Sequence, residues 1–86
     1  MIDPTKLANR LGGRARGSNS VDVPGVVRIR VNRDSIKIIP KRGHHQVINL
    51  DNLFSERESV QMVKENILWE GAAIERIAEE VDGCIQ

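Results

Sequence analysis

The chain has 86 residues, of which 40% are hydrophobic and 29% charged, with one phenylalanine, one tryptophan and no tyrosine. A chain of this length forms one small domain, which buries only about 60 to 65% of the surface of its extended form. The core must be built from valine, isoleucine and leucine, and the scarcity of aromatic side chains disfavours single-strand binding by base stacking.

The net charge of +1 is the sum of two unlike halves. Residues 1–45 contain ten Lys or Arg and three Asp, a balance of +7. Residues 46–86 contain three Lys or Arg and nine Asp or Glu, a balance of −6. A basic segment of this kind favours a polyanionic partner, unless the acidic half of the same chain neutralises it.

Residues 1–24 predict a flexible basic arm with a short helix at 4–11. Asp3 is a suitable N-cap and Pro4 suits the first helical position. The stretch 13–20 is rich in glycine, serine and arginine and lacks apolar periodicity, which is typical of a mobile linker.

The remaining residues, 25–86, predict a single α+β domain. Apolar and polar residues alternate over 27–31 and again over 36–39, as in the two strands of a β-hairpin, and 47–50 is a candidate for a third short strand. The apolar face of such a hairpin needs a cover because two strands alone are marginal in water.

A helix over about 56–82 supplies that cover. Ser55 and Glu58 match a capping box, and apolar residues recur at helical spacing beyond them. Gly71 offers an alternative break into two shorter helices. The expected fold is therefore a β-hairpin or three-stranded antiparallel meander packed on one long or Gly71-broken C-terminal helix, in a dimer.

The same helix carries a second apolar surface. If it is continuous, Met62, Trp69 and Ala73 project away from the stripe that covers the hairpin. We expect these residues, with Ile67, to form the interface with a second copy or with another protein, since monomers rarely expose large apolar patches. The alternative is a single exposed tryptophan, which is common on protein surfaces.

Enzymatic and metal-binding motifs are not evident. His44 and His45 are adjacent and point apart in an extended segment, and the sequence offers no further ligands at suitable spacing. Cys84, the single cysteine, has no neighbouring base to activate it and no partner for an internal disulfide. We expect a non-enzymatic cytoplasmic protein without a cofactor, a signal peptide or a membrane-spanning segment.

The basic half gives the leading hypothesis, a small regulatory protein of the phage or plasmid kind that binds duplex DNA. Its expected contacts are Arg14, Arg16, Arg28, Arg30, Lys37, Lys41 and Arg42. Charges on the outer face of a hairpin also serve solubility alone. The alternative function is a protein-interaction module docking through the C-terminal helix, including an inhibitor whose acidic residues mimic nucleic acid: Glu75, Glu79, Glu80 and Asp82.

Overall fold

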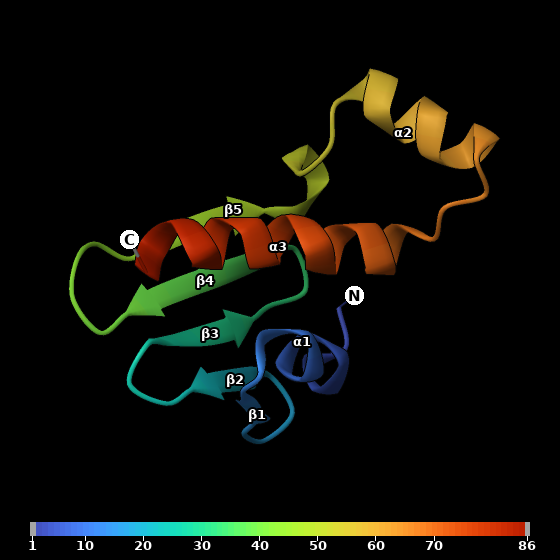
Figure 1. Ribbon diagram of the computed structural model, residues 1–86. Helices are drawn as coiled ribbons and strands as arrows, with labels where there is room; N and C mark the ends of the chain where they lie inside the picture. Colours follow the sequence, from blue (N-terminus) through green and yellow to red (C-terminus); the bar gives the residue numbers. More distant parts are fainter. Residues whose placement is uncertain (1, 86) are drawn as a thin grey trace.

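The computed structural model describes the backbone of residues 2–85 and the side chains of residues 2–83, so that the side chain of Cys84 lies outside the described part. The fold is α+β, with helices packed on one face of an antiparallel sheet (Figure 1). Five strands follow one another in chain order: β1 (Arg14–Ala15), β2 (Ser20–Val23), β3 (Val27–Val31), β4 (Ser35–Pro40) and β5 (Gln46–Asn49). The helices are α1 (Pro4–Leu11), the 3-10 helix η1 (Leu50–Asn52), α2 (Glu56–Lys64) and α3 (Trp69–Ile85).

Helix α1 forms where the sequence predicts it. The Asp3 carboxylate accepts a hydrogen bond from the Thr5 amide at 2.9 Å, and Gly12 ends the helix with a left-handed φ of 71°. The next residue, Gly13, packs so closely on β2 that an added Cβ would lie 2.5 Å from the Asp22 carbonyl oxygen. The glycine pair therefore both ends α1 and lets the chain turn directly into the sheet.

Residues 1–24 are part of the domain, which differs from the flexible arm predicted from the sequence. Leu7 is fully buried, and β1 and β2 form the first hairpin of the sheet. The Arg16 amide donates to the Ser20 carbonyl at 2.7 Å across the hairpin turn. The physical reason is the apolar side of β2, where Val21 is fully buried against the same core as the central strands.

The central hairpin has the predicted alternation. Val27, Ile29 and Val31 of β3 face the core while the intervening arginines are exposed. The antiparallel meander of three strands is confirmed as β3, β4 and β5, and β2 and β1 extend it on the β3 side.

The C-terminal helix is not continuous from 56 to 82. A capping box between Ser55 and Glu58 starts α2 as predicted, but the helix ends at Lys64, and Asn66 adopts a left-handed φ of 56°. The break therefore lies before Gly71, which stands in the first turn of α3. It frees α3 to lie across the sheet, where Ala73, Ile74, Ile77, Ala78 and Val81 are buried, while α2 projects beyond the sheet (Figure 1).

Among the described residues, no helix combines the length and the apolar character that crossing a membrane requires.

Candidate nucleic-acid interface

The face of the sheet opposite α1 and α3 carries the basic side chains of the central strands. Strand pairing places Arg30 directly opposite Lys37, with Ser20 on the other side of Arg30. One step along the strands, Arg28 lies between Asp22 and Ile39. Arg28 and Arg30 are exposed and Lys37 is half-buried, so all three cations are available from this side.

Cations on this face outnumber the nearby carboxylates. No carboxylate of the described residues lies within 4 Å of Arg28, Arg30 or Lys37. Like charges directly opposite each other on paired strands destabilise a sheet. The Arg30 and Lys37 pair is therefore an unfavourable arrangement for the sheet alone, and an anion bound over it would relieve the repulsion.

The first hairpin adds two further arginines to the same side. Arg14 pairs across from Asp22, and the Arg16 Nε lies 3.2 Å from the Asp22 Oδ2. Asp22 thus forms an ion pair with Arg16, just after β1, and among the described residues the β3 and β4 cations form no ion pair. We call Arg14, Arg16, Arg28, Arg30 and Lys37 the basic sheet face.

Lys41 and Arg42 are the two other residues predicted to contact DNA. Of these, only Lys41 lies at an edge of the basic sheet face. Lys41 follows β4, and its amide donates to the Val26 carbonyl at 3.1 Å. Arg42 is exposed in the turn that leads to β5.

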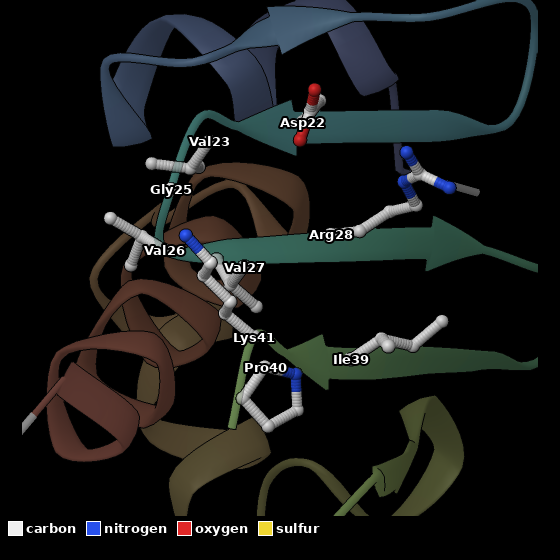
Figure 2. A pocket seen from close by; sticks show the side chains of 9 residues that line it. All are labelled: Asp22, Val23, Gly25, Val26, Val27, Arg28, Ile39, Pro40 and Lys41. Carbon is white, nitrogen blue, oxygen red and sulfur yellow. The ribbon is translucent and has the colours of Figure 1, made fainter. Parts of the chain in front are cut away.

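An open hollow of about 320 Å³ lies where β2 turns into β3 and β4 ends. Figure 2 shows Asp22, Arg28 and Ile39 on neighbouring strands beside this hollow. Its lining also includes Pro40 and Lys41. The hollow adds apolar surface to the end of the basic sheet face. No sequence pattern predicts this hollow, because it arises from the pairing of three strands and a turn.

The acidic helix does not cover the basic sheet face. The carboxylates of α3 pair instead with α1, on the opposite side of the sheet: Glu70 with Lys6 at 2.9 Å and Glu75 with Arg10 at 2.6 Å. The hydrogen bond from Arg10 is the main cause of the lowered pKa of Glu75. The described ion pairs between the two halves of the chain therefore all involve α1, and the β-strand cations take no part in them.

Glu70 links the N-terminus of the chain to α3, and this link makes stability depend on pH. The pKa of Glu70 is lowered, first by the Asp3 amide, which donates to Oε2 at 2.9 Å, and then by the Lys6 ammonium. A carboxylate with a lowered pKa in the folded state stabilises the fold above its usual pKa, and this contribution is lost as the pH falls through the lowered value. We expect Glu70→Gln to destabilise the protein near neutral pH and to match the wild type in acid.

Urea unfolding of both proteins at about pH 7 and about pH 3 measures this difference. Thr5→Ala, an exposed change on α1, is the control that leaves the Glu70 contacts in place. An equal difference between Glu70→Gln and wild type at both pH values would contradict the assignment.

The four residues predicted as an apolar interface do not form one surface. Met62 and Ile67 line a groove of about 350 Å³ between α2 and α3, and Trp69 is 36% exposed at the start of α3. Ala73 is fully buried in the core, so its assignment to an exposed interface is wrong. The reason is the helix break, which changes the rotation of α3 relative to α2.

The described residues contain no group of three or more His, Cys, Asp or Glu side chains arranged to hold a metal ion. His44 and His45 are both exposed in the turn between β4 and β5.

Comparison of the sequence with models of protein families, and of the chain with curated proteins and solved structures, finds no significant match in any of the three.

Proposed function

We propose that the protein is a non-enzymatic binder of duplex DNA that uses the basic sheet face. The observation that carries this proposal is Arg30 opposite Lys37 on a sheet face that no described helix covers, with Arg28 beside them and no carboxylate of the described residues within 4 Å. Duplex DNA presents one negative charge per about 1.7 Å of its axis, a density that suits such an array.

The width of the sheet favours contact with the phosphate backbone. Strands lie about 4.8 Å apart, so five of them span about 19 Å, whereas the major groove is about 12 Å wide. A whole sheet of this width does not enter the groove as a two-stranded ribbon does. Binding through phosphates positions a protein without reading the bases, so we expect weak sequence preference.

The salt dependence of binding tests the proposal. Each neutralised phosphate contributes about 0.9 to the slope of log affinity against log salt, so the four cations of the basic sheet face other than Arg16, which is paired with Asp22, give a slope of about −3.6. Raising salt from about 50 mM to about 200 mM should then weaken binding roughly 150-fold. Fluorescence anisotropy with a labelled duplex of mixed sequence measures both values.

A single-stranded oligonucleotide of the same sequence is the control, and it should bind more weakly because the face lacks aromatic side chains for stacking. The absence of duplex binding at micromolar protein and low salt would refute the proposal.

A second candidate function, protein interaction, is favoured by the surface around α2. Helix α2 contains no buried residue, and Val63 and Leu68 are 78% and 81% exposed. We propose that this side of the molecule forms a protein contact, separate from the basic sheet face.

A further inference from the structure

Strand β5 forms one edge of the sheet, and no strand of the described residues pairs with its outer side (Figure 1). Natural sheets protect such edges with very short strands, charged side chains or proline. The opposite edge, β1, follows this rule, because it has two residues and one of them is Arg14. Strand β5 has neither a charged residue nor a proline, and its Val47 side chain is 65% exposed. The β5 edge is therefore open to another strand.

The main-chain groups at this edge point outward in a fixed order. The Leu50 amide, just after β5, donates to the Asp34 carbonyl, just before β4, at 2.9 Å. Alternate residues of an antiparallel strand bond to the same neighbour, so Ile48 and Gln46 also direct their N–H and C=O groups to β4. The peptide groups between them leave four groups that point away from β4: the His45 carbonyl, the Val47 N–H, the Val47 carbonyl and the Asn49 N–H.

These four groups are complementary to their own copy. When two β5 strands run antiparallel with Val47 opposite Val47, each Val47 N–H meets the Val47 carbonyl of the other copy. Each Asn49 N–H likewise meets the His45 carbonyl of the other copy. The Asn49 carbonyl also points outward, but it belongs to the N-cap of η1 and accepts within that helix. Every outward donor thus finds an acceptor, and no charged side chain of β5 opposes its like.

We propose that the protein forms a twofold dimer in which the β5 strands of two copies pair antiparallel, with Val47 opposite Val47. A second copy supplies the matching strand because the order of donors and acceptors along β5 is the same in reverse, as a twofold interface requires. The exposed Val47 side chains then cover each other, since directly opposed residues have Cβ atoms about 5 Å apart.

The dimer places the basic sheet faces of both copies on one side of a continuous sheet. Directly paired residues of antiparallel strands share a face, so the twofold axis is perpendicular to the sheet. Lys37 lies opposite Val47 within each copy, so the two Lys37 strands are three strand spacings, or about 14 Å, apart. This separation exceeds the Debye length of about 8 Å at physiological ionic strength, so salt screens their repulsion. The pairing does not depend on DNA binding.

Charges at position 47 test the dimer with the full chain and without DNA. Val47→Lys and Val47→Glu each place like charges directly opposite each other, so we expect each variant's dimer to be at least about tenfold weaker than that of the wild type. An equimolar mixture brings opposite charges together, so we expect it to dimerise more tightly than either variant alone. Sedimentation equilibrium measures these affinities, and circular dichroism verifies that each variant is folded.

Val63→Lys is the matched control, because it makes the same change at an exposed valine of α2 and leaves β5 intact. We expect its dimer to be as strong as that of the wild type. A wild type that stays monomeric up to about 1 mM protein overturns the proposal. The same conclusion follows from a mixture no tighter than its components, or from a dimer that Val63→Lys weakens as much as Val47→Lys does.

Amide hydrogen exchange tests the register of the pairing. The amides of Val47 and Asn49 form hydrogen bonds only in the dimer, so we expect their exchange to slow as the protein concentration rises. Exchange that does not change with concentration at these two amides, in a protein that dimerises, contradicts the pairing of β5. DNA binding by the basic sheet face is measured separately, so a monomer that binds duplex DNA overturns the dimer alone.

Discussion

Replacing Leu7 with alanine is expected to destabilise the whole domain by about 2 to 5 kcal/mol. Leu7 is fully buried in the core with Ile2 and Val21, so the change removes apolar contacts and leaves a cavity. Domains of this kind have a total stability of about 5 to 15 kcal/mol, so the loss is a large part of it. Urea unfolding followed by circular dichroism measures the difference.

The size of this effect distinguishes an integral α1 from a mobile arm. Asn9→Ala, on the exposed side of α1, is the matched control and should change stability by less than about 0.5 kcal/mol. If Leu7→Ala is as stable as Asn9→Ala, residues 1–24 do not unfold together with the rest of the domain. That result would contradict the packing of α1 on the core.

Patterns that depend on neighbouring residues could be predicted from the sequence. The alternation of Val27, Ile29 and Val31 defines β3 because successive side chains of a strand point to opposite faces. The capping box of Ser55 and Glu58 forms within four residues, with both of its hydrogen bonds present. Each of these features depends on residues that are close together in the sequence, so it can be predicted without knowing how the rest of the chain packs.

Features that depend on tertiary packing could not be predicted. The segment before Val21 has the composition of a linker, and it joins the sheet because β1 pairs with β2, which in turn pairs with β3. The helix break at Asn66 is likewise decided by α3, which buries Ala73 and Ile77 against the sheet. The hydrophobic stripe from Val60 to Val81 suggested one helix, but α2 uses its apolar residues for a surface that lies outside the core.

The candidate site was predicted in its residues but not in its geometry. The sequence placed Arg28, Arg30 and Lys37 on one polar face, which the strand register confirms. It could not tell whether the acidic helix covers this face. That depends on which side of the sheet α3 packs, and Glu70 and Glu75 lie with α1 on the opposite side.

Reversing the charge of both β3 arginines, Arg28→Glu with Arg30→Glu, is expected to weaken duplex DNA binding at least about 100-fold at low salt, or about 2.8 kcal/mol. The change removes two phosphate contacts and places two anions against the backbone at the centre of the basic sheet face. Both side chains are exposed on a strand whose core side is unchanged, so the fold should be retained. Anisotropy titrations with a labelled duplex measure the loss, and circular dichroism verifies the fold.

The conservative variant Arg28→Lys with Arg30→Lys separates charge from base reading. Lysine neutralises a phosphate as a point charge but lacks the rigid planar fork with which arginine makes two parallel hydrogen bonds to guanine. We expect this variant to bind within a few-fold of wild type and to keep its salt slope, because the sheet is too wide to enter the major groove. A loss comparable to that of the glutamate variant would mean that Arg28 and Arg30 read base edges. Unchanged binding by the glutamate variant would remove the basic sheet face from the interaction altogether.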